Sequence, residues 1–360
     1  MINIKRVFKE NSIKEKMFLN YENSIQNKVF NNIMFIGDPH IMSKNISKRN
    51  DDIQLMDVIL DKLSQCAKIS HEKKAYSIIL GDLFNSNNEN NIELMTKLVN
   101  VLNSFYEIPI TLIGNHEKTE TTIVDSDMLK TLNDSGVIDV INENELFGMI
   151  SITDENNNIE QVEFGGTPYG MKIPQKVKAK SKKTESIIWV THHDLMFKDY
   201  YPGSTPLHSI DGVCMAVNGH MHKTQPQIQI GNTYWYCTGN ILRMSTDCDE
   251  HIPSVWLWSP SHHKNNYDKL LQIPLNYKKD IFNKPKKFEA TEVLDFNFKN
   301  TNEKLNFIKQ MEFSEQNDEE NKTDDKQIVR ECLETLGEVY NLPKTIRDEL
   351  SDLLSNINDD

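Results

Sequence analysis

The sequence lacks any long apolar run. No uninterrupted stretch approaches the ~20 residues that a membrane-spanning helix requires. The first residues mix both signs of charge and lack the apolar core of a signal peptide. These absences predict a protein without membrane association, soluble and retained in the cytoplasm, which is the host cytoplasm if the source is a virus.

Cysteines are few and do not form paired motifs. The 360 residues contain five cysteines, an odd number, and no two of them are spaced as C-x-x-C. A disulfide framework or a zinc ribbon needs tighter and even spacing. We therefore expect reduced thiols that are mostly buried.

The sequence also lacks net positive charge, since 40 lysines and arginines stand against 53 acidic residues. The formal net charge of −13 argues at first against a nucleic-acid substrate. The charge is unevenly placed, because residues 311–360 hold fifteen acidic and five basic side chains, a net charge of −10. The first 310 residues therefore carry only −3. The acidity belongs to a C-terminal tail, and the body of the protein is nearly neutral.

The first half of the chain alternates apolar strands with amphipathic helices. Apolar runs predict strands at 32–37, 76–80 and 109–113. Apolar residues at helical spacing predict helices at 52–65 and 91–104 between them. Strands that alternate with helices form a parallel sheet through right-handed crossovers.

The second half is predicted to be mostly strand. The expected strands lie at 186–190, 213–217, 228–230, 233–237, 255–258 and 269–273. Gly231-Asn232 predicts a tight hairpin turn between two of them. We expect these strands to form a second sheet packed on the first, which places the fold in the α/β class.

Polar motifs directly follow five of the predicted strands. They are D-P-H at 38–40, G-D-L-F at 81–84, G-N-H-E at 114–117, T-H-H at 191–193 and G-H-M-H at 219–222. Functional groups gather at the carboxyl ends of parallel strands, so these motifs are expected to meet. Carboxylate, amide oxygen and imidazole are all ligands of divalent ions. The set predicts a metal centre rather than five unrelated turns.

The five motifs, in this order, resemble the signature of the calcineurin-like metallophosphoesterases over about residues 31–275. Finer features resemble the SbcD-type DNA repair nucleases, of which bacteriophages carry compact forms. These features are G-D-L-F, the stretch 48–52, G-G-T-P-Y-G at 165–170 and Tyr236-x-x-Gly239-x-x-x-Arg243. The resemblance implies a four-layer α/β/β/α sandwich with a small cap and a helical C-terminal tail.

The resemblance also implies a role for each site residue. Two divalent ions, with manganese as the working metal, would share Asp82 as a bridge. The implied ligands are Asp38, His40, Asp82 and His222 for one ion, and Asp82, Asn115, His192 and His220 for the other. His193 is the alternative to His192. His116 would be the catalytic residue that acts on the scissile phosphate and donates a proton to the leaving oxygen. The ligand set alone does not separate manganese from iron, zinc or cobalt.

A lysine-rich stretch is the candidate DNA contact. Residues 172–183 contain six lysines and no acidic residue. Lys172, Lys176, Lys178 and Lys180 would bind the DNA backbone in a salt-dependent way. The alternative interpretation is a solvated loop.

Changes in composition suggest four segments. They are an N-terminal extension at 1–30, a nuclease domain at 31–277, a reduced capping region at 278–311, and an acidic linker with a helical hairpin at 312–360. Each helix of the hairpin has an apolar stripe. The hairpin either docks on its own domain or, as the resemblance implies, binds an SMC-like (SbcC-type) ATPase.

The ligand motifs predict a dinuclear-metal phosphoesterase. The resemblance implies that it is a phosphodiesterase that cleaves DNA, the nuclease subunit of an SbcCD-like recombination and repair complex, working as a homodimer. Two alternatives stay open. One is a phosphatase or cyclic-nucleotide phosphodiesterase on the same scaffold. The other is a structural subunit with a vestigial metal site that anchors an ATPase, and the intact ligand set argues against it.

Overall fold

The computed structural model describes residues 28–46, 49, 54–118, 123–154, 156–198, 200, 202–260, 267, 269–279 and 281–282. The chain divides into two units, Met1–Lys284 and Pro285–Asp360, and the described residues belong to the first. The helical hairpin and almost all of the predicted N-terminal extension and capping region lie outside the described residues. Within the described part, no helix is long and apolar enough to cross a membrane.

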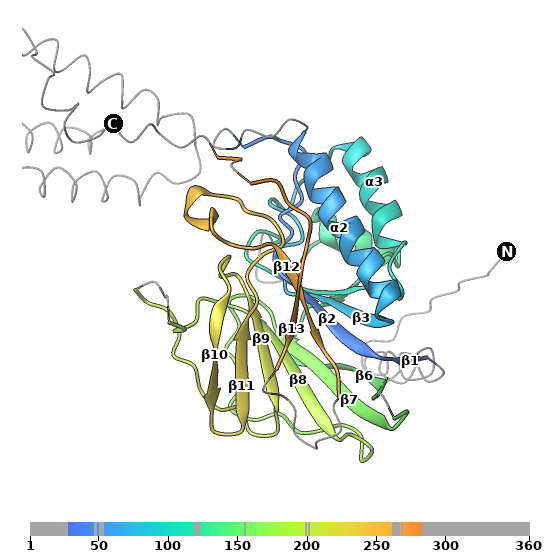
Figure 1. The fold of residues 1–360 in the computed structure, drawn as a ribbon, viewed down its shortest axis with the longest axis vertical. Coiled ribbons are helices and arrows are strands. Elements are labelled where there is room, and N and C mark those ends of the chain that lie inside the picture. The colour runs from blue at the N-terminus through green and yellow to red at the C-terminus, as the bar shows by residue number, and fades with distance from the viewer. Residues whose placement is uncertain are drawn as a thin grey trace, which may run out of the picture. The chain divides into compact units, whose positions relative to one another are not determined.

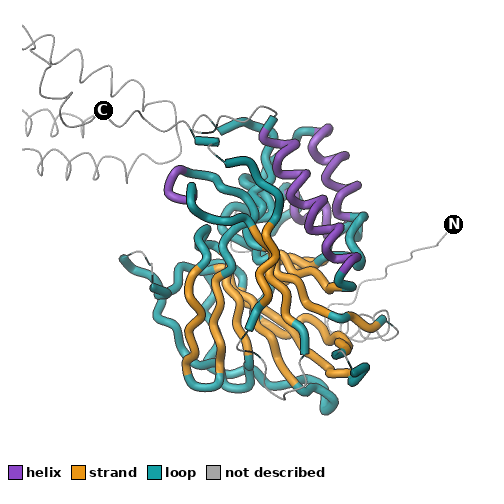
Figure 2. The backbone as a smooth tube through the Cα atoms, viewed as in Figure 1, coloured by secondary structure: helices purple, strands orange, loops and turns teal. Residues whose placement is uncertain are grey.

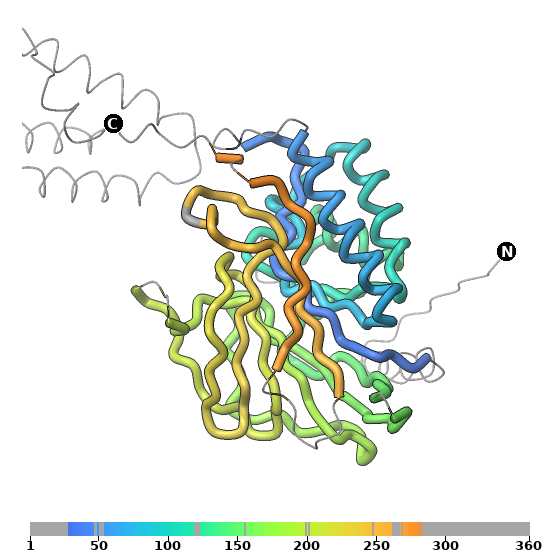
Figure 3. The backbone as a smooth tube through the Cα atoms, viewed as in Figure 1, coloured from blue at the N-terminus to red at the C-terminus, as the bar shows by residue number. Residues whose placement is uncertain are grey.

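Six strands form the first sheet, in the order β13-β12-β2-β3-β4-β5 (Figure 1). Their bounds are Asn32–Ile36 (β2), Ala75–Ile79 (β3), Ile110–Leu112 (β4), Asp139–Ile141 (β5), Ser254–Trp258 (β12) and Leu271–Pro274 (β13). β2, β3 and β4 are parallel, as predicted, and β5, which the sequence interpretation missed, is parallel to β4. β12 pairs antiparallel with both β2 and β13. Figure 3 shows this long-range pairing as orange segments beside a blue one.

Helices cover the outer face of the first sheet, and Figure 2 shows the two longest of them side by side in purple. The helices are α2 (Leu55–Glu72), α3 (Ile92–Leu102) and α4 (Met128–Asp134). β2 contributes side chains to two hydrophobic cores. Met34 and Ile36 pack with the helices, while Ile33 and Phe35 face the second sheet. Successive side chains of a strand point to opposite faces, so a strand buried on both sides needs a continuous apolar run.

Seven strands form the second sheet, in the order β1-β6-β7-β8-β9-β11-β10. Their bounds are Val29–Phe30 (β1), Glu145–Thr153 (β6), Ile159–Thr167 (β7), Ser186–His192 (β8), Met215–Gly219 (β9), Gln225–Ile230 (β10) and Thr233–Cys237 (β11). β7, β8, β9 and β11 run parallel, so a second set of carboxyl ends lies at one edge. A short 3-10 helix, Thr246–Cys248, follows this sheet in the chain.

The two-sheet α/β sandwich predicted from the sequence is confirmed. Among the described residues, helices cover the outer face of the first sheet and loops cover the outer face of the second. Trp189 and Trp235 are fully buried there beneath Leu195 and Phe197 from the connection between β8 and β9. That connection contains two prolines and two glycines between residues 202 and 212, which disfavour a helix.

The hairpin of β6 and β7 is the largest element that the sequence interpretation missed. β6 alternates between buried and partly exposed positions. Ile150 and Ile152 are buried between the two sheets, and beyond a bulge Leu146 is buried on the opposite face. This period of two is the signal of a half-buried strand and was present in the sequence. The helix predicted at 52–65 also extends further, to Glu72, because Cys66, Ala67 and Ser70 continue its buried face.

The Tyr76 hydroxyl generates a prediction about stability. Tyr76 is fully buried between the sheets, and its hydroxyl has no hydrogen-bond partner among the described residues. Burial raises the pKa of Tyr76 well above its usual value. Burying an unpaired hydroxyl costs about 1–3 kcal/mol. We therefore expect Tyr76→Phe to raise the free energy of unfolding by about 1 kcal/mol, measured by guanidinium denaturation.

Tyr236→Phe is the matched control for this substitution. The Tyr236 hydroxyl is also buried, but it donates a hydrogen bond to the Tyr267 carbonyl at 2.7 Å. Its removal should therefore lower the free energy of unfolding by about 1 kcal/mol. Equal destabilisation by the two substitutions would contradict the unpaired state of the Tyr76 hydroxyl.

Candidate metal centre

The predicted ligands come from both sheets and follow or end five parallel strands. They are Asp38 and His40 after β2, Asp82 after β3, Asn115 after β4, His192 at the end of β8, and His220 and His222 after β9. The structure brings these seven side chains together in two groups. Their individual roles as ligands stay predictions.

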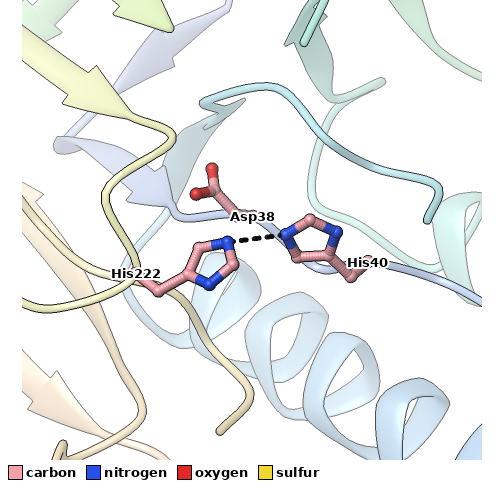
Figure 4. Close-up of side chains that lie close together, drawn as sticks. All are labelled: Asp38, His40 and His222. Atoms are coloured by element: carbon pink, nitrogen blue, oxygen red, sulfur yellow. Dashed lines mark hydrogen bonds between the residues drawn. The ribbon is translucent and has the colours of Figure 1, made fainter. Parts of the chain in front are cut away.

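Asp38, His40 and His222 form the first group, with one ligand atom of each within 4.8 Å of the others (Figure 4). The Nε2 atoms of His40 and His222 lie 2.9 Å apart. Neither carboxylate oxygen of Asp38 has a hydrogen-bond partner among the described residues, although the side chain is fully buried. Burial raises the pKa of Asp38 to about 7. A divalent cation fits this position because it would hold the buried carboxylate in its ionised form.

Asp82, His192 and His220 form the second group. Asn115 belongs to it as well, since its Oδ1 lies 3.1 Å from His192 Nε2 and 2.9 Å from His220 Nδ1. Asp82 Oδ2 lies 3.2 Å from His192 Nε2 and 3.8 Å from His40 Nε2. Asp82 therefore lies between the two groups, which is the position of a bridging ligand.

The contact between Asp82 and His192 dominates their ionisation. Burial alone would raise the pKa of Asp82, but His192 holds it well below its usual range. Burial alone would lower the pKa of His192, but Asp82 raises it to about 9. Metal ligands must give up their protons, so a divalent ion would take the place of the proton that this pair holds.

Hydrogen bonds behind the ligands orient two of the imidazole rings. His192 Nδ1 donates to the Leu80 carbonyl at 2.7 Å, which leaves Nε2 for a metal ion. His220 Nε2 lies 3.1 Å from Asp194 Oδ2, which leaves Nδ1 on the side of Asn115. The sequence interpretation did not include Asp194, although it directly follows the T-H-H motif.

The backbone at the site is unusual. Four predicted ligands have positive φ angles, namely 25° at Asp38, 47° at His40, 45° at Asp82 and 68° at His220. This left-handed conformation costs a residue with a side chain about 1 kcal/mol or more. Such conformations cluster at ligand-binding and active sites, where surrounding contacts hold them.

Two glycines let the ligand loops approach each other closely. A Cβ atom on Gly114 would overlap Asp82 Oδ1, and one on Gly81 would overlap the ring of His192. Gly81 also has a φ of 98°. Glycine is therefore required at both positions by space, and at Gly81 by conformation as well.

Glu117 ties two of the ligand loops together. It is fully buried, and its carboxylate accepts hydrogen bonds from the N–H groups of Leu83 at 2.7 Å, Phe84 at 3.3 Å and Gly114 at 2.9 Å. Burial raises the pKa of Glu117 to about 8, while the backbone donors oppose that rise. Because all three contacts are N–H donors, the geometry fits the ionised carboxylate. In the sequence, the only indication of this role was that Glu117 ends the G-N-H-E motif.

The structure separates the two other histidines of the motifs. His116 is exposed, and one of its ring nitrogens lies near His40 and Asp82 in a third group of candidate ligand atoms. Its Nδ1 donates to the Asn85 carbonyl at 3.0 Å. His193 instead donates from Nε2 to the Met171 carbonyl at 2.8 Å, and it belongs to none of the ligand groups of the described residues. This placement favours His192 over His193 as the ligand.

A pocket of about 600 Å³ opens over the ligands. It is lined by Asp82, Asn115, His116, Asp194, Lys198, Tyr200, His220, Met221, His222, Lys223 and Gln225. The four lysines predicted as DNA contacts, Lys172, Lys176, Lys178 and Lys180, are not part of this lining. Lys176 pairs with Asp211, and Lys180 donates to the Leu146 carbonyl at 2.8 Å.

Comparison with known proteins gives weak likenesses. No family model and no curated protein matches this chain. Among solved structures, it is similar to a 5'-nucleotidase from Candida albicans, with 13% identity, 78% of this chain and 57% of that chain covered, and a TM-score of 0.38. It is also similar to a 5'-nucleotidase precursor from Thermus thermophilus, with 9% identity, 67% and 52% covered, and a TM-score of 0.36.

A third similar structure is the calcineurin-like phosphoesterase YfkN from Bacillus subtilis, with 13% identity, 59% of this chain and 82% of that chain covered, and a TM-score of 0.35. The chain spans little more than half the length of the nucleotidases. At these TM-scores the likenesses carry no argument about function, which rests on the geometry of the site.

The position of Glu117 generates a prediction about metal binding. In Glu117→Gln, an amide NH₂ group must face a backbone N–H donor, so at least one hydrogen bond is lost. We expect the free energy of unfolding to fall by about 1–3 kcal/mol. We also expect metal affinity, measured by calorimetric titration with Mn²⁺, to fall at least about tenfold, since the loops that carry Asp82 and Asn115 are no longer tied together.

Glu163→Gln is the matched control. Glu163 is also fully buried and accepts hydrogen bonds from the N–H groups of Lys180 at 2.9 Å and Ser181 at 2.7 Å. This substitution should cost similar stability and leave metal affinity unchanged. Equal loss of metal affinity in both variants would show that Glu117 has no specific link to the site.

Proposed function

We propose that this protein is a dinuclear-metal phosphodiesterase that cleaves DNA. The observation that supports it most is the meeting of seven predicted ligands in two groups, with Asp82 between them. On the sequence resemblance alone, we also propose that it acts as a homodimer beside an SMC-like ATPase, with DNA repair and recombination as its role. The residues expected to bind that partner, 312–360, lie outside the described part of the chain.

The donor set suits divalent metal ions. It combines two carboxylates, one amide oxygen and four imidazoles, a mixture that accepts Mn²⁺, Fe²⁺, Co²⁺ and Zn²⁺. Manganese is the ion that the resemblance implies. Bound ions of this kind act as Lewis acids, which neutralise charge on a phosphate and lower the pKa of water.

His116 is suited to proton transfer. Unlike Asp38 and His40, it is exposed, and it lines the pocket. Its Nδ1–H is held by the Asn85 carbonyl, so Nε2 is the nitrogen that can exchange a proton with a bound substrate. A protonated imidazole there would donate to the leaving oxygen of a phosphodiester as the P–O bond breaks.

Hydrolysis assays with the purified protein and Mn²⁺ test the proposal. We expect cleavage of labelled DNA and of bis(p-nitrophenyl) phosphate, a small diester, and much slower hydrolysis of p-nitrophenyl phosphate, a monoester. Asp82→Asn should lower both diester activities at least about 100-fold and release metal, measured by elemental analysis, because both groups lose their shared charge.

Asp211→Asn is the control, since this exposed carboxylate pairs with Lys176 outside the pocket lining. It should keep both activity and metal. Normal turnover with full metal content in Asp82→Asn would contradict the two-metal assignment. Hydrolysis of the monoester alone would instead support the phosphatase alternative.

His116 generates a separate prediction. As a proton donor, its loss in His116→Asn should lower turnover of labelled DNA, whose leaving alkoxide needs a proton, by about 10²–10⁴-fold while the bound metal and the melting temperature stay unchanged. The loss on bis(p-nitrophenyl) phosphate should be much smaller, because p-nitrophenolate leaves without protonation. His220→Asn should lose metal as well as activity. If the two variants lose the same amount of metal, His116 is a ligand and the assignment of roles is wrong.

A further inference from the structure

We propose that Lys198 and Lys223 bind the phosphates that flank the scissile one, so that this site selects a nucleotide chain over an isolated phosphate ester. The inference rests on the proposed function, because it takes the scissile phosphate to lie at the predicted metal ligands. Both lysines line the same pocket as Asp82, His116 and His222.

The chain before Lys198 determines where its side chain emerges. Leu195 and Phe197 are buried in the outer core of the second sheet, with exposed fractions of 0% and 3%. The backbone is pinned there, since Met196 N–H donates to the Thr205 carbonyl at 3.0 Å and Leu195 forms a bridge with Thr205. With Phe197 anchored in the core, Lys198 is exposed and reaches the pocket.

Lys223 directly follows the predicted ligand His222, so the two Cα atoms are about 3.8 Å apart. The buried thiol of Cys237 contacts the backbone here, because its Sγ lies 3.4 Å from the Met221 carbonyl and 3.5 Å from the Lys223 carbonyl. The side chain of Lys223 is exposed and lines the pocket. Both lysines therefore extend from fixed backbone beside the ligands.

The charges of the pocket favour a polyanion. Its two acidic lining residues each face a histidine, Asp82 with His192 at 3.2 Å and Asp194 with His220 at 3.1 Å. One phosphate at the ligands would be neutralised by the metal ions there. Lysines act on phosphate as point charges, and each phosphate of a nucleic-acid strand carries one negative charge. Lys198 and Lys223 add two positive charges to this pocket. They therefore suit a nucleic-acid strand, because the phosphates on either side of the scissile one would lie near them.

Kinetics on two substrates test the inference. The substrates are a labelled single-stranded oligonucleotide and bis(p-nitrophenyl) phosphate, which has only one phosphate. Lys198→Ala and Lys223→Ala should each lower kcat/KM on the oligonucleotide about tenfold, mainly through KM. The loss on the small diester should be at least fivefold smaller. Each substitution should also reduce the slope of log kcat/KM against log salt concentration by roughly one.

Three controls separate charge from structure. Lys198→Arg and Lys223→Arg keep the charge and should retain most of the oligonucleotide activity. Lys68→Ala removes a lysine of α2 whose side chain is 77% exposed, and it should match the wild type on both substrates. The bound manganese of the double alanine variant, measured by elemental analysis, should equal that of the wild type.

Several outcomes would overturn the inference. Equal losses on both substrates, or loss of metal, would assign the lysines to the integrity of the metal site. A double variant with wild-type oligonucleotide cleavage and salt slope would show that they bind no phosphate. A wild type that cleaves only the small diester would remove the inference and the DNA substrate, and would leave only the dinuclear-metal phosphodiesterase chemistry of the proposed function. A wild type that cleaves neither substrate would remove both.

Discussion

The buried carboxylate of Asp82 is the constraint on which the rest of the site depends. An isolated ionised carboxylate is very costly to bury, so it must be surrounded by cations and hydrogen-bond donors. Asp82 has His192 at 3.2 Å from the second sheet and the His116 N–H at 3.0 Å from the first. The carboxyl ends of the strands of both sheets therefore have to lie at the same place. Gly114 packs so closely against Asp82 that a Cβ atom there would overlap Asp82 Oδ1.

This arrangement is held by polar groups that do not belong to the predicted ligand set. Glu117 joins the loops after β3 and β4 through three backbone N–H groups. Asn218 joins the ends of β8 and β9, because it accepts from the Thr191 hydroxyl at 2.7 Å and donates to the His193 carbonyl at 2.9 Å. These contacts lie directly beside Asp82 and His220, two of the four predicted ligands with a left-handed backbone, and they help to hold that strained conformation in place.

Net charge is a poor guide to what this protein binds. A formal charge of −13 argues against a nucleic-acid substrate, yet most of it lies in residues 311–360, outside the described part. Inside the pocket, both acidic residues are engaged with histidines, and two lysines stand beside the ligands. Local potential in a cleft, rather than total charge, governs the binding of a charged ligand. The proposal that the site binds a nucleotide chain follows from this local arrangement.

The sequence by itself determined the α/β class, three parallel strands of the first sheet and the five ligand motifs, because apolar runs and the polar residues that end them are local patterns. The tertiary structure alone decided how β12 pairs with β2, and it places His192, the histidine that the sequence analysis preferred over His193, among the predicted ligands. It also decided that Asp194 orients His220 and that Lys198 and Lys223, rather than the lysines of 172–183, line the pocket. Each of these outcomes depends on segments far apart in the chain that meet only when the two sheets pack, and no local pattern encodes that meeting.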